Sequence, residues 1–137
     1  MQATDVSCAV IVREGMILAA SRGNQVSNSG AWEFPGGKPK EGETPRECVV
    51  RRVQEELNLS INVVDELKNF TVKTSEEKTY NIYPFLAEIV NGNVELGYHS
   101  RAEWFMPMQL MGLAWPETDV PIIDEIVSRI FKTGKIV

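Results

Sequence analysis

The chain begins with two apolar runs that predict adjacent strands. Residues 6–12 are apolar and largely β-branched, which is typical of a buried strand. Glu14 and Gly15 form a turn signal, and the apolar run 16–20 predicts the returning strand. Later runs predict further strands over 61–64, 70–73, 79–89 and 94–96, the last two joined by an Asn91–Gly92 turn.

One helix is delimited by signals at both ends. Thr44 is followed by Pro45 and, three positions after Thr44, by Glu47, which is a capping box with proline at the first helical position. Asn58 tolerates the left-handed conformation in which many helices end. The spacing therefore predicts a helix over 45–57.

The two faces of this helix differ in polarity. Its apolar residues recur at helical spacing and predict the face turned toward the core: Cys48, Val49, Val50, Val53 and Leu57. Charged residues four positions apart lie on another face: Glu47, Arg51 and Glu55. Charges in this pattern usually form a solvated surface. The glycine-containing loop that precedes the helix is what suggests a further role for them.

The C-terminal part predicts a short helical turn over 107–111 and an amphipathic helix over 121–131. Strands on both sides of one central helix, followed by a terminal helix, predict an α+β fold in which a mixed sheet lies between helices. No repeat or linker interrupts the 137 residues, so we expect a single domain over 1–137.

Charge and composition narrow the partners. The formal net charge is −5 and no basic stripe is visible, which disfavours polymeric nucleic acid. No apolar run reaches the length of about 18 residues that a membrane span needs, and no signal peptide precedes Cys8, so we expect a cytoplasmic protein with no membrane partner. Cys8 and Cys48 lie in apolar contexts and predict buried thiols rather than metal ligands. Monomer and homodimer both stay open.

A glycine pair precedes the helix and an acidic pair ends it. Gly36 and Gly37 allow the backbone to approach a ligand closely. Glu55 and Glu56 supply oxygen atoms that suit a hard cation such as Mg²⁺, which commonly sits against substrate phosphates. Such a cation polarises phosphorus and lowers the pKa of bound water. The stretch therefore predicts a metal–phosphate site.

This stretch resembles the Nudix box, whose pattern is Gly-x5-Glu-x7-Arg-Glu-apolar-x-Glu-Glu-x-Gly-apolar. Seven of the nine specified positions match: Gly37, Glu43, Arg51, Val53, Glu55, Glu56 and Leu59. The lead-in at 32–38, WEFPGGK, is similar to the MutT and CTP pyrophosphohydrolase branch of the family. The resemblance covers nearly the whole chain and implies the Nudix α/β/α sandwich with a mixed β-sheet.

The resemblance also implies a reaction. It is the Mg²⁺-dependent hydrolysis of a nucleoside triphosphate to the monophosphate and pyrophosphate, with Mn²⁺ as the alternative cation. Glu55, Glu56 and the Gly36 carbonyl would hold the metal. Arg51 would orient these carboxylates, and Glu43 would support or share the metal site. Charge neutralisation and positioning would supply most of the rate enhancement.

Other residues are implied to bind the substrate. Lys38 would meet phosphate as a point charge. Arg22 lies in a polar loop and is a candidate for a phosphate or ribose contact, and Lys78 at a polar hairpin tip is a further candidate. Phe34 has two interpretations, a core residue or a ring that stacks on the base.

Asp119 has two interpretations as well. It is the N-cap of the last helix, or it reads the edge of the base. An ionised carboxylate only accepts hydrogen bonds, so a base-reading Asp119 would favour an amino donor such as cytosine N4. Cytosine and oxidised nucleotides are therefore the candidate substrates.

Three positions depart from the family. Asn58 replaces a glycine, which is a mild change at a helix end. Arg52 replaces a glutamate that binds metal or assists the attacking water, and it can pair with Glu56 and compete with the metal. Tyr98 stands where many relatives have another glutamate, and the nearest carboxylates that would substitute are Glu95 and Glu103.

These departures leave a second hypothesis open, a catalytically impaired Nudix-like nucleotide-binding or sensor protein. Arg52 and Tyr98 each remove a carboxylate that the family usually supplies. His99, which follows Tyr98, is the single histidine of the chain. A lone histidine is more often a polar surface or capping group than a catalytic base, and we expect that role here.

Overall fold

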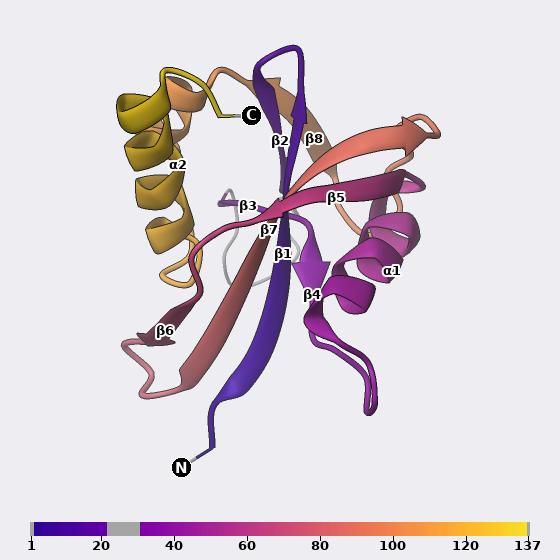
Figure 1. Ribbon diagram of the computed structural model, residues 1–137. Helices are drawn as coiled ribbons and strands as arrows, with labels where there is room; N and C mark the ends of the chain where they lie inside the picture. The colour runs from indigo at the N-terminus through magenta and orange to yellow at the C-terminus, as the bar shows by residue number, and fades with distance from the viewer. Residues whose placement is uncertain (1, 22–30, 137) are drawn as a thin grey trace.

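The computed structural model describes residues 2–21 and 31–136. Within them, eight strands form one sheet (Figure 1). The strands are β1 (Thr4–Arg13), β2 (Met16–Ser21), β3 (Trp32–Glu33), β4 (Gly36–Gly37), β5 (Ser60–Glu66), β6 (Phe70–Lys73), β7 (Thr79–Asn91) and β8 (Arg101–Phe105). The helical elements are α1 (Pro45–Leu57), the 3₁₀ helix η2 (Pro107–Gly112) and α2 (Val120–Thr133).

The centre of the sheet is β1. It runs parallel to β7, with Thr4 opposite Tyr80 and Ile11 opposite Ala87. Its other edge pairs antiparallel with β4 and, further along, with β2. The free edge of β7 pairs antiparallel with β6 and then with β5, and β2 also pairs with β3 and β8. One parallel pair among antiparallel ones makes the sheet mixed, as predicted.

Side-chain alternation along β1 divides the core into two layers. Cys8 and Val10 pack in the cluster that contains the isoleucines of α2, whereas Ala9 and Ile11 pack in the cluster that contains Val49, Val53 and Leu57 of α1. Successive residues of a strand point to opposite faces, so each face of the sheet receives one helix. Figure 1 shows α1 and α2 on opposite sides of the sheet. The predicted α/β/α sandwich is therefore confirmed.

Two local predictions are wrong. Val50 was assigned to the core face of α1, but its side chain is exposed, while Glu56 on that helix is buried. No strand forms over 94–96, because the chain after β7 turns back over the end of α1 instead of forming a hairpin. There the Glu95 amide donates to the Leu57 carbonyl over 3.0 Å. A Cβ on Gly92 would lie 2.5 Å from the Asn58 carbonyl oxygen, so this turn is shaped by its contact with α1.

Candidate active site

The glycine loop is held between β1 and α1. Gly36 and Gly37 form β4 and pair with Cys8 and Ser7 of β1. Gly36 has φ +153°, and a Cβ there would lie 2.0 Å from the Ser7 carbonyl oxygen, so no other residue fits. The loop therefore presents bare backbone to the side chains of α1.

The predicted capping box sets where α1 begins. The Thr44 hydroxyl accepts from the Glu47 amide over 3.1 Å, and the Glu47 carboxylate accepts from the Thr44 amide over 2.9 Å. Asn58 ends the helix in the left-handed conformation. These local contacts fix the helical phase, and thereby the directions in which Arg51, Arg52 and the two terminal acids point.

Glu43, Arg51 and Glu55 form a cluster near the surface, which we call the outer cluster. Arg51 donates to both oxygens of Glu43, from Nε over 2.7 Å and from Nη2 over 2.8 Å. Its Nη1 donates to Glu55 Oε1 over 3.0 Å. The hydrogen bonds from Arg51, together with one from the Lys40 amide, lower the pKa of Glu43 to about 2. Glu43 thus ties the loop to the helix as a group that is ionised at neutral pH.

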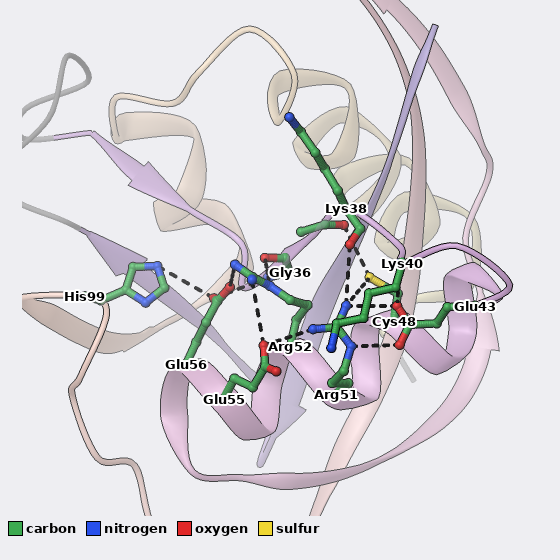
Figure 2. Close-up of polar contacts among 11 residues, drawn as sticks. Gly36, Lys38, Lys40, Glu43, Cys48, Arg51, Arg52, Glu55, Glu56 and His99 are labelled. Atoms are coloured by element: carbon green, nitrogen blue, oxygen red, sulfur yellow. Dashed lines mark hydrogen bonds and ion pairs between the residues drawn. The ribbon is translucent and has the colours of Figure 1, made fainter.

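Arg52, Glu56, Gly36, His99 and Glu33 form a second group, which we call the inner cluster. Arg52 donates from Nη2 to Glu56 Oε2 over 2.7 Å and from Nε to the Gly36 carbonyl over 3.2 Å. Figure 2 shows Arg52 between Gly36 and Glu56, with Arg51 and Glu43 on one side of it and His99 on the other. Burial raises the pKa of Glu56, and the charge of Arg52 opposes that shift.

His99 corrects the expectation of a surface or capping group, because its side chain is completely buried. Its Nε2 lies 2.7 Å from Glu33 Oε2 and 4.0 Å from Glu56 Oε1. Sequence reasoning overlooked Glu33 because nothing in its local sequence connects it with a histidine 66 positions away. Glu95 and Glu103 do not replace the missing family acid here, since Glu95 accepts a hydrogen bond from Asn58 and Glu103 pairs with Arg101.

A cavity of about 400 Å³ opens beside the inner cluster. The charged and aromatic residues that line this cavity come from five segments of the chain: Glu33, Phe34, Lys38, Arg52, Tyr98 and Asp119. The cavity therefore joins most of the predicted substrate-binding residues to the glycine loop. An adjoining hollow of about 360 Å³ shares Val6 and Thr118 with it and extends toward the hairpin between β6 and β7.

Phe34 and Asp119 both line this cavity and are hydrogen-bonded to each other. The Phe34 ring is buried and stacks on Trp115, with centroids 4.8 Å apart and planes at 19°. The Phe34 amide donates to Asp119 Oδ2 over 3.0 Å, and the Thr118 hydroxyl donates to Oδ1 over 3.1 Å. Asp119 is the N-cap residue of α2, as one interpretation predicts, but its carboxyl makes no cap hydrogen bond to that helix. Burial raises its pKa to about 7, so it is only partly ionised at neutral pH.

The remaining predicted substrate residues lie in different places. The Lys38 side chain extends away from the carboxylates in Figure 2, and the residue lines the cavity. Lys78 lies in the hairpin between β6 and β7, where its amide donates to Thr74 Oγ1 over 3.3 Å, and it does not line the cavity. Arg22 lies outside the described residues.

Comparison with known proteins agrees with this geometry. The model of the NUDIX domain matches residues 1–129. The chain belongs to the Nudix family. It is 26% identical over 128 residues to a CTP pyrophosphohydrolase of Escherichia coli, with 93% of this chain and 94% of that protein covered. Nudix proteins act on pyrophosphate bonds of nucleotides, which indicates a pyrophosphohydrolase.

One further relative and one solved structure show which Nudix proteins this chain is similar to. It is 35% identical over 101 residues to an RNA pyrophosphohydrolase of Cereibacter sphaeroides, where the match covers 74% of this chain and 57% of that protein. The crystal structure of a MutT protein from Methanosarcina mazei superposes with a TM-score of 0.79 at 26% identity, and the match covers 97% of this chain and 96% of that one. The MutT-like branch predicted from the sequence is thus confirmed. Among the described residues, neither α1 nor α2 has the length and apolarity that a membrane span requires.

Nudix hydrolases generally use divalent cations, and the three expected donors of this chain are hard oxygen atoms. Their arrangement here does not fit such an ion. The Gly36 carbonyl and Glu56 Oε2 both accept from Arg52, whose Nη1 also lies 3.7 Å from Glu55 Oε1. The described residues contain no group of three or more acidic, histidine or cysteine side chains able to hold a metal. The positive charge that lies among these three donors is the guanidinium of Arg52.

Proposed function

We propose that the protein hydrolyses a nucleoside triphosphate to the nucleoside monophosphate and pyrophosphate. Water forms a bond to one phosphorus, and the bond from that phosphorus to a bridging oxygen breaks, with pyrophosphate as the leaving group. The observation that carries this proposal is one cavity whose wall contains Phe34 and Asp119 together with Gly36, Gly37 and Lys38.

The loop and helix suit the phosphate end. Lys38 lines the cavity and brings a positive charge on a flexible side chain, which suits a phosphate oxygen. Arg51 pairs with Glu43 and with Glu55, and so ties the loop before α1 to the last turn of that helix. The Mg²⁺ requirement, with Mn²⁺ as the alternative, is part of the proposal. Glu55, Glu56 and the Gly36 carbonyl would be available to such an ion only without their present contacts to Arg52.

Phe34 and Asp119 suit the nucleoside end. Phe34 lines the cavity and is held by stacking on Trp115, and Asp119 contributes a buried carboxyl to the same wall. With a pKa near 7, Asp119 accepts hydrogen bonds in its ionised form and can also donate one in its protonated form. We therefore propose cytosine nucleotides, read by ionised Asp119, and oxidised nucleotides as the substrates to test first.

The experiment is a measurement of pyrophosphate release over a panel of canonical and oxidised NTPs and dNTPs, with Mg²⁺ or Mn²⁺. A 5′-triphosphorylated RNA belongs in the panel, because a relative is named an RNA pyrophosphohydrolase. We expect one class of free nucleotide to be hydrolysed, and Glu56→Gln to lower that rate about a hundredfold or more. The matched control is Glu66→Gln, an exposed glutamate on β5. No hydrolysis of any nucleotide, or an unchanged rate in Glu56→Gln, would overturn the proposal.

Asp119→Ala tests the base assignment separately. If Asp119 reads the base, this variant loses its discrimination between cytosine and guanine nucleotides. If discrimination is unchanged, Asp119 only anchors the Phe34 amide. Contacts from Arg22 and Lys78 to the substrate stay predictions, to be tested through the KM of their alanine variants.

A nucleotide-binding protein with little hydrolysis is the second candidate. The pairing of Arg52 with Glu56 is the observation that motivates it. The relatives described above carry the names of hydrolases, and none of them supports it. Nucleotide binding without pyrophosphate release across the same panel would establish it in place of the first proposal.

A further inference from the structure

Arg52 contacts all three groups that the sequence assigned to a metal. Its Nη2 lies 2.7 Å from Glu56 Oε2, its Nε lies 3.2 Å from the Gly36 carbonyl oxygen, and its Nη1 lies 3.7 Å from Glu55 Oε1. The contacts are drawn in Figure 2. One side chain thus brings a full positive charge to the position expected for the cation.

The loop is shaped to receive this guanidinium. A Cβ on Gly37 would lie 2.5 Å from Arg52 Nε and 2.9 Å from its Cζ, so the absence of a side chain at Gly37 makes room for it. The Glu56 side chain is only 3% exposed and needs a compensating charge, because a buried ionised carboxylate without a partner is costly. Arg52 supplies that charge.

An ordinary ion pair along the helix does not explain these contacts. Arg51 pairs with Glu55 in the same four-residue relation that Arg52 has to Glu56, and its other contacts are to Glu43 and, over 3.5 Å, to the Lys38 carbonyl. Arg52 differs because the carbonyl it reaches, over 3.2 Å, is that of Gly36, the one expected to hold the metal. The Arg52 guanidinium also lies 6.0 Å from the centre of the Tyr98 ring. The two positions at which this chain lacks a family acid are therefore neighbours, and a cation and an aromatic ring stand there together.

We propose that Arg52 is a built-in cation that holds Gly36, Glu55 and Glu56 together, and that a divalent ion binds these groups only by displacing it. This inference deepens the proposed function, since it concerns the cation requirement of the same site. The bonds from Arg52 to Glu56 and Gly36 are lost when the ion enters. Divalent ions therefore bind more weakly to this chain than to a variant without the guanidinium.

Mn²⁺ binding in the absence of nucleotide tests this directly. Free Mn²⁺ is measured by its electron paramagnetic resonance signal during titration of the wild type, Arg52→Gln and Arg52→Glu. We expect the affinity to rise about tenfold or more in Arg52→Gln, because the competing charge is gone, and further in Arg52→Glu. The matched control is Arg46→Glu, which makes the same charge change at an exposed position of α1. An affinity in both Arg52 variants no higher than in the wild type or in Arg46→Glu would overturn the inference.

Thermal unfolding supplies a second measurement. Arg52→Glu places an additional acid beside Glu56, so we expect its Tm to fall without Mn²⁺ and to rise with Mn²⁺ by more than the wild-type Tm does. A variant that folds only with Mn²⁺ supports the inference. A variant that Mn²⁺ leaves unfolded, or raises no more than the wild type, counts against it, and Arg52→Gln gives the same comparison with a milder change.

The outcomes separate the inference from the proposed function. If the wild type hydrolyses nucleotides and the Arg52 variants gain no Mn²⁺ affinity, the inference fails while the function stands. If the variants gain Mn²⁺ affinity and no form releases pyrophosphate, the function fails while the inference stands.

Discussion

The outer and inner clusters lie on the same helix and are built from the same chemical groups, yet their surroundings differ. In the outer cluster, Arg51 meets Glu43 near solvent, and the pKa of that carboxyl falls. In the inner cluster, Arg52 meets Glu56 in a buried setting, and burial raises the pKa of Glu56 despite the nearby charge.

The contrast shows what each arginine does. Near solvent, the bidentate pair joins the loop to the helix, and its net contribution to stability is small because water and salt screen it. In the interior, the arginine keeps a charge tolerable where water cannot solvate it. Adjacent residues of α1 therefore have different roles: Arg51 ties the loop to the helix, and Arg52 neutralises the buried charge of Glu56.

We expect the largest difference in stability between alanine substitutions at Gly36, in β4, and at Gly42, in the segment between β4 and α1. Gly36→Ala should lower the free energy of unfolding by about 4 kcal/mol or prevent folding, because its Cβ would lie 2.0 Å from the Ser7 carbonyl oxygen. A Cβ on Gly42 would meet nothing within 4 Å, so Gly42→Ala should lower the free energy of unfolding by only about 1 kcal/mol, because of its φ of +80°. Urea unfolding measures both, and equal losses would contradict the contrast.

The two arginines are expected to differ next. Arg52→Ala should lower the free energy of unfolding at pH 7 by about 3 kcal/mol, since it leaves Glu56 buried without its partner. Arg51→Ala removes more hydrogen bonds but should cost clearly less, because the side chains of Glu43 and Glu55 are more exposed to water than that of Glu56. Urea unfolding of the two variants is the measurement. A larger loss for Arg51→Ala would show that the outer cluster is the more important one.

Asp119 extends the comparison to pH. Its pKa is raised from the ordinary value of 3.8 to about 7, so its stabilising contribution is complete below about pH 4 and is lost as the pH rises toward 7. Relative to Asp119→Asn, the wild type should lose about 1 kcal/mol of stability per pH unit in that window. Urea unfolding at several pH values checks this. A difference between the two proteins that does not change with pH would show that Asp119 is ionised throughout.

Glu43 should show the opposite sign and a smaller effect. Its pKa is lowered from 4.5 to about 2, so its contribution is present above about pH 4.5 and is lost as the pH falls toward 2. Relative to Glu43→Gln, the wild type should lose stability between these values, by an amount reduced by solvent. Acid unfolding followed by circular dichroism measures it. Identical acid midpoints for the two proteins would contradict the assignment.

Features determined by neighbouring residues were predictable from the sequence. The helix over 45–57 has the predicted bounds because Thr44, Glu47 and Asn58 determine its ends through contacts within a few positions. The pairing of Arg52 with Glu56 was also accessible, since residues four apart on a helix meet. The family pattern added the arrangement of the sheet between the two helices.

Features determined by distant residues were not predictable. Asn91–Gly92 carries a hairpin signal, but contact with the Asn58 carbonyl directs the chain elsewhere. His99 looked like a surface residue until the fold placed it against Glu33 in the interior. Asp119 stands at the predicted N-cap position, but its carboxyl accepts from an amide 85 positions earlier instead of capping the helix. In each case a long-range contact outweighed a local preference.

The parallel pairing of β1 with β7 has a consequence for how the chain folds during its synthesis. Thr4 must find Tyr80, and such non-local pairing is slow to form because a long loop has to close first. Gly36 and Gly37 pair with the other edge of that same β1 strand. During synthesis, the glycine loop therefore lacks its finished support until β7 has left the ribosome. We expect a nascent chain that stops before residue 79 to be unable to retain a nucleotide, although its whole loop and α1 have already been made.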